Sequence, residues 1–283
     1  VLIMEDLGQH PTLADLLLGG DREAAEDGLL EWAAALGRLN ALTLVRAAEL
    51  AAQRAQFPRS PYRPQAAWAF NAGVHYFGQL AESLAVRLPA GLESELATIR
   101  QFVETDLQAF SPCDVCPDNN FLTPDGVRFF DLEFADFHNA LLDGAYLSIL
   151  FPTCWCVGSL PPGARTRTEA AYREALVVGE PRVADNEYFA SAMAMACAAW
   201  VIVTLNWHHP PLKDADHFSS RPPQRWAISG RARLVHRAEV LAARCREWGQ
   251  LPAVTEVVDG MAGAWRVTWS PSESELPLYP AFS

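Results

Sequence analysis

Lysine is almost absent from this chain. Lys213 is the single lysine among 22 basic residues, so every other basic residue is an arginine. Any mechanism that needs a lysine at a given place along the chain can therefore be checked by inspection. The net charge of −12 argues against a broad surface for nucleic-acid phosphates, so nucleic acid is not an expected partner. An acidic chain of this kind suits a small, cationic substrate.

Nothing at the start of the sequence resembles a targeting segment. The apolar residues 1–4 are too few for a signal peptide, and Glu5 and Asp6 follow at once. Residues 188–205 are apolar enough to reach the lower limit for a membrane span. Their alanine-rich first half and the lack of flanking basic residues instead predict a buried central helix. We therefore predict a cytoplasmic protein without membrane contact.

Internal repeats and low-complexity linkers are absent as well. The 283 residues are half apolar and one fifth charged, which is the composition of a globular protein that buries a core. Without a linker, no domain boundary is expected inside the helical part of the chain.

The six cysteines include two pairs that are close in sequence. Cys113-x-x-Cys116 together with Cys154-x-Cys156 is open to interpretation as a zinc site or a redox pair. The second spacing is too tight for a usual zinc knuckle. We therefore expect reduced cysteines that are packed in the interior.

The hydrophobic pattern predicts a mostly helical chain with one β-hairpin. Residues 1–8 form a short buried strand. The hairpin comprises residues 121–123 and 127–131 around a turn at 124–126, and residues 133–138 form a loop. Residues 265–269 form either a strand or a segment that wraps the surface. Helices are expected over residues 13–18, 21–54, 65–86, 92–110, 139–150, 168–178, 188–205 and 228–248, the second with an apolar stripe of Leu29, Leu30, Ala33, Leu36, Leu39 and Leu42.

Three polar side chains between residues 111 and 133 stand at informative spacings. Asp114 is a loop carboxylate, the amide of Asn119 follows five positions later, and Asp131 ends the hairpin. Taken singly, each is a typical turn-capping or strand-end residue. Phosphoryl transfer from ATP, however, needs an acceptor for the proton of the attacking hydroxyl and oxygen ligands for magnesium. The triple with its hairpin spacing matches the catalytic and magnesium loops of kinases.

At these residues the chain resembles a known family. Asp114-Val-Cys-Pro-Asp-Asn119, followed by Phe-Phe-Asp131-Leu-Glu133, is similar to the aminoglycoside phosphotransferase and choline kinase family, whose pattern is H-G-D-x-x-P-x-N and then [I/F]-D-x-E. The resemblance implies that Asp114 is the catalytic base and that Asn119 and Asp131 hold Mg²⁺. It also implies that Asp143 braces the catalytic loop through backbone hydrogen bonds.

The same resemblance implies an ATP site at the start of the chain. Residues 1–8 are similar to the hinge strand that follows the N-terminal lobe, where backbone groups of Glu5 and Leu7 would meet adenine. Residues 9–283 then correspond to the helical C-terminal lobe of a protein-kinase-like fold, so the fold class is α+β and predominantly helical. The implied activity is transfer of the γ-phosphoryl group of ATP to a hydroxyl of a small aminoglycoside-, choline- or sugar-like molecule.

Two departures from the family pattern bear on activity. Pro112-Cys113 replaces the His-Gly that precedes the catalytic Asp and normally buttresses the loop. A phosphate-gripping lysine should precede the hinge, whereas Lys213 follows the catalytic loop. We therefore expect that the N-terminal lobe is missing and that this chain alone has negligible ATP turnover. The alternative is a catalytically inactive kinase-like module that binds a small molecule or a partner.

Neighbouring residues have plainer interpretations. Asp118 and Asn120 are expected to shape the turn, and Asp136 to be a loop residue. Glu133 either supports the metal site or faces solvent. A surface loop, rather than a metal site, is expected for His208, His209 and His217. Packing in the interior, rather than a pocket for a cation, is expected for Trp200, Trp207 and Trp226.

Overall fold

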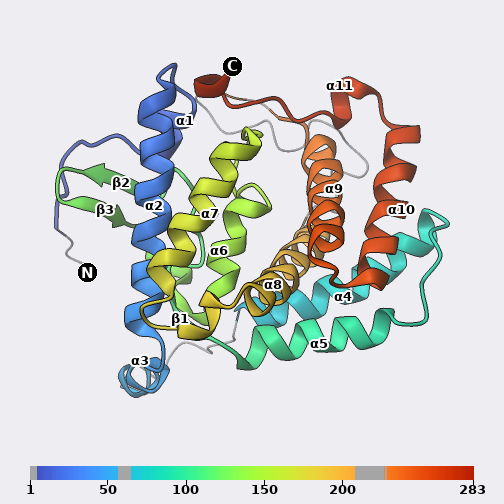
Figure 1. The fold of residues 1–283 in the computed structure, drawn as a ribbon, viewed down its shortest axis with the longest axis horizontal. Coiled ribbons are helices and arrows are strands. Elements are labelled where there is room, and N and C mark those ends of the chain that lie inside the picture. The colour runs from blue at the N-terminus through green and yellow to red at the C-terminus, as the bar shows by residue number, and fades with distance from the viewer. Residues whose placement is uncertain (1–4, 57–64, 208–225, 227) are drawn as a thin grey trace.

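The computed structural model describes residues 5–56, 65–207, 226 and 228–283, which form a mostly helical protein with two small sheets (Figure 1). The coarse fold class predicted from the sequence, α+β and predominantly helical, is confirmed. The helices are α1 (Leu13–Leu17), α2 (Arg22–Thr43), α3 (Ala47–Arg54), α4 (Gln65–Ser83), α5 (Leu92–Thr105), α6 (Ala140–Ser148), α7 (Pro162–Leu176), α8 (Asn186–Trp207), α9 (Gly230–Trp248), α10 (Pro252–Thr268) and α11 (Pro271–Ser274), with short 3-10 turns η1 (Leu132–Phe134), η2 (Pro181–Ala184) and η4 (Pro280–Phe282).

The apolar helix α8 lies in the core. It packs against α4, α5, α6 and α9. Its segment Asn186–Leu205 is long and apolar enough to cross a membrane, but 72% of its most apolar window is buried inside the protein. A helix that is apolar on all sides and covered by other helices is typical of a domain core. The predicted buried helix over residues 188–205 is confirmed.

Helix α2 packs closely along α7. The two backbones approach at Gly37, where an added Cβ would lie 2.5 Å from the carbonyl oxygen of Tyr172. The predicted apolar stripe is correct at Leu29 and Leu36, which are fully buried, but wrong at Leu42, which is 75% exposed. Leu42 lies in the last turn of α2.

Two antiparallel pairs of four-residue strands flank the loop that contains residues 112–119. β2 (Asn120–Thr123) pairs with β3 (Gly126–Phe129), which confirms the predicted hairpin. β1 (Gln108–Ser111) pairs with β4 (Asp136–Asn139). Sequence reasoning missed this second pair, because it assigned residues 92–110 to one helix and residues 133–138, including the buried Asp136, to a loop.

Three other predictions are wrong. Residues 5–8 form no strand, and the Gly8 amide donates to Asp6 Oδ1 at 2.9 Å; residues 1–4 lie outside the described part. The helix predicted over residues 21–54 is broken between α2 and α3, where Val45 has a φ of 64°. Residues 265–269, predicted as a strand or a segment that wraps the surface, form neither. Trp265 belongs to helix α10 and stacks on Trp269, with ring centroids 5.4 Å apart.

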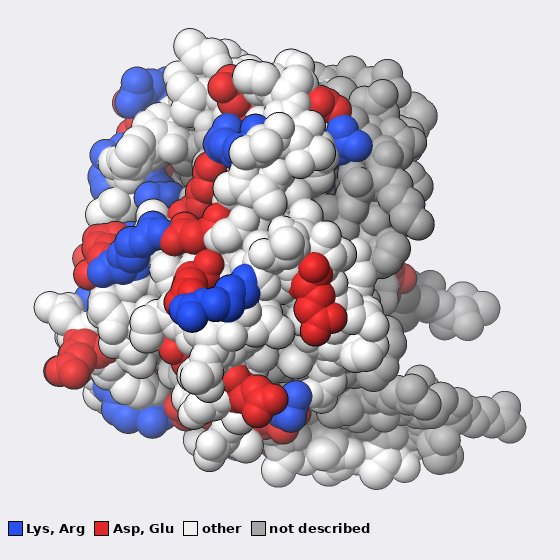
Figure 2. Space-filling model, turned by 90° about the vertical axis from the view of Figure 1, so that its right-hand side faces the viewer, with Lys and Arg blue, Asp and Glu red and all other residues white. Residues whose placement is uncertain are grey.

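Charged side chains are mixed in sign over the described part of the surface in Figure 2, where acidic and basic groups lie next to one another. Exposed ion pairs such as Arg266–Glu239 at 2.6 Å and Arg87–Glu256 at 2.9 Å show the same mixing. Such exposed pairs contribute about 0–1 kcal/mol each to stability. That face therefore offers no field of a single sign to steer a highly charged partner.

Candidate functional site

The loop between β1 and β2 carries the predicted catalytic residue. Inside this loop, the Asn119 amide donates to the Cys116 carbonyl at 2.9 Å, and the Phe130 amide donates to the Asn119 carbonyl at 3.1 Å. Asn120 is buried, and its Nδ2 donates to the carbonyls of Cys116 and Pro117, each at 3.1 Å. These bonds satisfy backbone groups of an irregular segment. They confirm that Asn120 shapes the turn.

Three hydrogen-bond donors hold the Asp114 carboxylate. Asn119 Nδ2 donates to Asp114 Oδ2 and to the Asp114 backbone carbonyl, both at 3.1 Å. Asp114 Oδ1 accepts from Thr153 Oγ1 at 2.6 Å and from the Tyr146 hydroxyl at 3.2 Å. Burial, with the charge of Asp114 beside it, raises the pKa of Tyr146 well above its ordinary value, so this hydroxyl remains a donor. A carboxylate has about four acceptor positions, so the half-buried Asp114 can accept one further hydroxyl.

The hairpin returns Asp131 to the neighbourhood of Asn119. Phe130, the residue before Asp131, donates its amide to the Asn119 backbone at 3.1 Å. Asp131 is exposed and has a φ of 58°, in the left-handed region that Asp adopts more readily than most residues. Within the described residues, neither Asn119 Oδ1 nor the Asp131 carboxylate has a hydrogen-bond partner. The structure thus joins Asp114 and Asn119 directly, and brings in Asp131 through the backbone of its neighbour.

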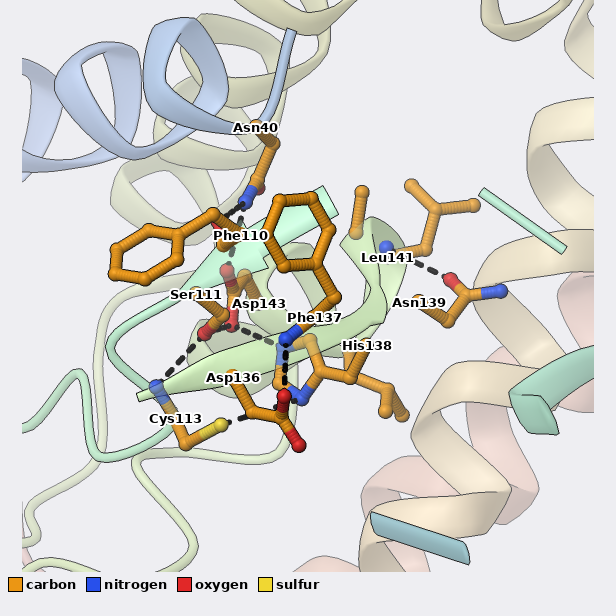
Figure 3. Close-up of polar contacts among 12 residues, drawn as sticks. Asn40, Phe110, Ser111, Cys113, Asp136, Phe137, His138, Asn139, Leu141 and Asp143 are labelled. Carbon is orange, nitrogen blue, oxygen red and sulfur yellow. Dashed lines mark hydrogen bonds and ion pairs between the residues drawn. The ribbon is translucent and has the colours of Figure 1, made fainter. Parts of the chain in front are cut away.

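Asp143 organises the base of the loop (Figure 3). Its buried carboxylate, on α6, accepts from Asn40 Nδ2 at 2.9 Å and from Ser111 Oγ at 2.7 Å. His138 Nε2 lies 2.9 Å from Asp143 Oδ1. Ser111 Oγ accepts in turn from the Cys113 amide at 2.8 Å. Asp143 therefore connects the loop to α2, β1 and β4, and the hydrogen bonds of its carboxylate run to side chains rather than to the loop backbone that the resemblance implied.

A disulfide ties the loop to the segment that follows α6. Cys116 and Cys154 are bonded to each other, with Cα atoms 5.6 Å apart. The predicted reduced state is wrong for these two residues, while Cys156, Cys197 and Cys245 are free and buried as predicted. Sulfurs that are bonded to each other are not thiolates, and a thiolate is the form that binds metal. In this disulfide-bonded form, Cys116 and Cys154 are not available to zinc as thiolate ligands.

Two buried arginines on α9 fix the backbone on either side of Thr153. Arg233 donates to the Cys154 carbonyl at 2.5 Å, and Arg237 donates to the Pro152 carbonyl at 2.9 Å. Burial lowers the pKa of Arg233 to about 10 and that of Arg237 to about 9. Both side chains remain charged at neutral pH with these values. Thr153 is thus presented to Asp114 by a backbone that two cationic side chains hold in place.

A cavity of about 280 Å³ lies beside Asp114. Apolar side chains from α4, α5, α6 and α8 form most of its wall, including Phe70, Leu142 and Trp200. The Trp200 indole is oriented by its Nε1, which donates to the Leu142 carbonyl at 2.7 Å. The polar part of the wall consists of Cys113, Asp114, His138 and Thr153.

Glu5 and Leu7, the predicted adenine contacts, stand apart from this cavity. Glu5 is exposed, Leu7 is half-buried, and neither residue lines the cavity. Asp118 holds the loop, because its Oδ2 accepts from Trp155 Nε1 at 2.5 Å. Glu133 is exposed in η1, so it faces solvent.

The remaining predicted residues divide between packed and undescribed positions. Trp226 is packed as predicted: its Nε1 donates to the Val157 carbonyl at 2.6 Å, and its ring stacks on Tyr279. Trp200 is buried but also borders the cavity. The described part of the structure does not include His208, His209, Lys213 and His217, nor the side chain of Trp207.

Sequence reasoning missed three contributors to the site. Thr153 touches Asp114 from 39 positions further along the chain, and Tyr146 and His138 approach from α6 and β4. Hydrophobic periodicity along the sequence gives no information about such contacts. Comparison of the sequence with protein-family models finds no match, and comparison with curated proteins finds none either. The function of the chain therefore has to be inferred from the geometry around Asp114.

Proposed function

We propose that this chain carries a phosphotransferase site, which moves the γ-phosphoryl group of ATP to the hydroxyl of a small amphiphilic molecule with Mg²⁺ as cofactor. The observation that supports this most is the contact of Asp114 with Asn119 beside a cavity, with Asp131 delivered next to them by the hairpin. Asn119, the Asp114 carboxylate that it contacts and the Asp131 carboxylate that follows Phe130 offer a proton acceptor and oxygen ligands. Phosphoryl transfer needs both.

The residues divide these roles between them. Asp114 accepts the attacking hydroxyl, and its own donors keep the carboxylate in one orientation. Asn119 Oδ1 and the Asp131 carboxylate fit Mg²⁺, because both are oxygen ligands without a partner in the described structure, and Mg²⁺ prefers oxygen. The metal, when bound, neutralises charge on the phosphates.

The wall of the cavity favours one class of acceptor among those that the resemblance implies. A sugar or an aminoglycoside carries many hydroxyls and needs a polar partner for each, because buried polar groups without partners are costly. Most of this wall is apolar, and Phe70 and Trp200 contribute aromatic rings. Aromatic faces attract quaternary ammonium groups, and Asp114 adds a negative charge. The preferred acceptor is therefore a choline-like amino alcohol.

Two further parts of the proposal come from the sequence. Adenine would meet backbone groups of Glu5 and Leu7, as the family resemblance implies. The cytoplasmic location also stays a prediction. The Cys116–Cys154 disulfide argues against it, because such bonds persist mainly in oxidising compartments.

Binding of Mn²⁺·ATP, followed by electron paramagnetic resonance, tests the metal site. Mn²⁺ replaces Mg²⁺ at oxygen ligands and gives a signal that changes on binding. Asp131→Ala and Asn119→Ala should each weaken binding at least tenfold. Asp125→Ala is the matched control, since Asp125 is an exposed carboxylate on the same hairpin. Equal binding by the Asp131→Ala and Asp125→Ala variants, or no binding by the wild-type chain, would contradict the proposed metal site.

An inactive binding module is the second candidate, and one observation favours it. Asp114 already accepts from Asn119, Tyr146 and Thr153, as a purely structural carboxylate does. The two candidates differ in what Asp114→Asn does. In a phosphotransferase that is supplied with an N-terminal lobe, the wild-type chain transfers phosphate to choline, and the variant keeps Mn²⁺·ATP binding but loses this transfer. In a binding module, the wild-type chain transfers nothing even when supplied with Mg²⁺, ATP and an N-terminal lobe.

A further inference from the structure

Cys113, His138 and Asp143 form a chain of interactions (Figure 3), and the proposed phosphotransfer uses neither the thiol nor the imidazole of this chain. Cys113 Sγ lies 3.8 Å from His138 Nδ1, and His138 Nε2 lies 2.9 Å from Asp143 Oδ1. His138 is 5% exposed and Asp143 is 1% exposed. A thiol, an imidazole and a carboxylate in this order are the parts of a cysteine nucleophile with its base and its orienting group.

The backbone of Cys113 is held in an unusual conformation. Its φ is 64°, in the left-handed region that residues other than glycine rarely adopt. The amide of Cys113 is fixed by Ser111 Oγ at 2.8 Å, and Ser111 is fixed by the Asp143 carboxylate at 2.7 Å. The same carboxylate therefore positions both the thiol-bearing loop and the imidazole. Strained backbone held in place by its surroundings is frequent at functional sites.

The surroundings of His138 favour its protonated form. Burial by itself lowers the pKa of His138, but the neighbouring Cys113 and Asp143 more than offset it, and the pKa lies well above its ordinary value. A protonated imidazole beside a thiol stabilises the thiolate, which is the reactive form. Asp143 faces Nε2, so Nδ1 is the ring atom directed at sulfur.

Cys113 also differs from the other cysteines in accessibility. It is half-buried and lines the cavity, whereas the other three free cysteines are buried. Burial raises the pKa of the Cys245 thiol to about 11 and shifts those of Cys156 and Cys197 still further upward. All four free cysteines lie in the described residues, and Cys113 is the one among them that is placed to react.

We propose that Cys113 is a nucleophile that accepts an apolar acyl group from a small ester or thioester bound in the cavity. The thiolate attacks the carbonyl carbon, and a carbon–sulfur bond forms. The bond from that carbon to the leaving oxygen or sulfur breaks, and the leaving group takes the bonding electrons and the proton from His138 Nδ1. The products are an acyl thioester on Cys113, a neutral His138 and an alcohol or thiol. The acyl chain lies against Phe70, Leu142 and Trp200, and Asp143 acts as a positioning residue.

This activity goes beyond the proposed phosphotransfer and does not depend on it, because neither Asn119 nor Asp131 takes part. Reaction of the purified chain with p-nitrophenyl hexanoate, without reductant so that the disulfide stays intact, gives the direct test. We expect a burst of one p-nitrophenolate per chain, and mass spectrometry should locate one hexanoyl group on Cys113. The rate of the burst should exceed the rate at which N-acetylcysteine releases p-nitrophenolate from the same ester by at least tenfold. With p-nitrophenyl acetate, which has a shorter acyl chain, this acceleration over N-acetylcysteine should be smaller. Cys113→Ser should abolish the burst, while Cys197→Ala should leave it unchanged.

The roles of His138 and Asp143 are tested by the pH profile of reaction at Cys113. A free thiol with a pKa of about 8.5 gains about tenfold in thiolate for each pH unit below that value. Alkylation of the wild-type chain by iodoacetamide should instead change less than threefold between pH 6 and 8. His138→Gln and Asp143→Asn should restore the steep profile. Should a variant fail to fold, the wild-type profile alone decides. A steep wild-type profile, or hexanoyl groups spread over other residues, would overturn the proposal.

Discussion

Asn119 Nδ2 donates to two oxygens of the same residue, the backbone carbonyl and the carboxylate of Asp114, at 3.1 Å in each case. One amide group thereby sets both the loop conformation at Asp114 and the direction of its side chain. The side-chain oxygen of Asn119, Oδ1, is left for another ligand. This relationship connects the stability of the loop to its chemistry.

Asn119→Ala should therefore destabilise the fold as well as weaken metal binding. The variant removes the donor to a half-buried carboxylate, and hydrogen bonds to charged groups contribute about 1.5–3 kcal/mol. Urea unfolding followed by circular dichroism should report a loss in this range. Asp125→Ala, in the exposed hairpin turn, should change the free energy of unfolding by less than about 0.5 kcal/mol. Equal effects of the two substitutions would show that the Asn119 contacts do not hold the loop.

The disulfide predicts a strong effect of reductant on stability. A bond between Cys116 and Cys154 closes a long loop in the unfolded chain, and such bonds typically contribute about 2–4 kcal/mol. Unfolding in urea should shift to lower concentration when dithiothreitol is added. The double variant Cys116→Ser/Cys154→Ser should unfold near the reduced wild type and should not respond to dithiothreitol. A wild-type chain that ignores reductant would mean that the bond does not form.

Two glycines in helices should respond with opposite sign to replacement by alanine. At Gly37 the new Cβ would lie 2.5 Å from the Tyr172 carbonyl, and overpacking of this kind costs about 1–3 kcal/mol. At Gly263, which is exposed on α10, a Cβ meets nothing within 4 Å. Alanine there should stabilise the fold by about 0.5–1 kcal/mol through helix propensity. Thermal melts of both variants test the close packing of α2 on α7.

His236 predicts a fall in stability in mild acid. Burial lowers its pKa to about 4, with Glu239 opposing the shift and Arg165 adding to it, whereas an unfolded histidine titrates near pH ~6.5. Between these values the unfolded chain binds more protons than the folded one. The free energy that uncharged His236 contributes to folding is therefore lost as the pH falls from about 6.5 to about 4. His236→Gln should reduce the slope of stability against pH in this window, and His75→Gln, at an exposed position on α4, should not.

The sequence predicted correctly those elements that are determined by residues close together along the chain. The hairpin β2–β3 is set by a turn between residues 123 and 126, and the long helices are set by apolar periodicity. The pairing of β1 with β4 joins Ser111 to Asp136 across the hairpin, so no short window contains it. The buried pairing also explains why Asp136 is not a loop residue.

The candidate site divides in the same way. Asp114 and Asn119 lie within one short loop, so their spacing along the chain could be recognised. The contacts of Cys113 with His138, of Thr153 with Asp114 and of Cys116 with Cys154 depend on how α6 and β4 return to the loop. The packing of the whole chain decides these contacts, and a motif does not contain that information.

The covalent ring closed by Cys116 and Cys154 contains the hairpin, β4 and α6. Asp143 fastens this ring to α2 and β1 through Asn40 and Ser111. Partial opening of one of these parts would have to break the shared anchor of the others. The amide protons of residues 116–154 should therefore exchange with solvent as one cooperative unit. We expect a site built in this way to open and close as one unit.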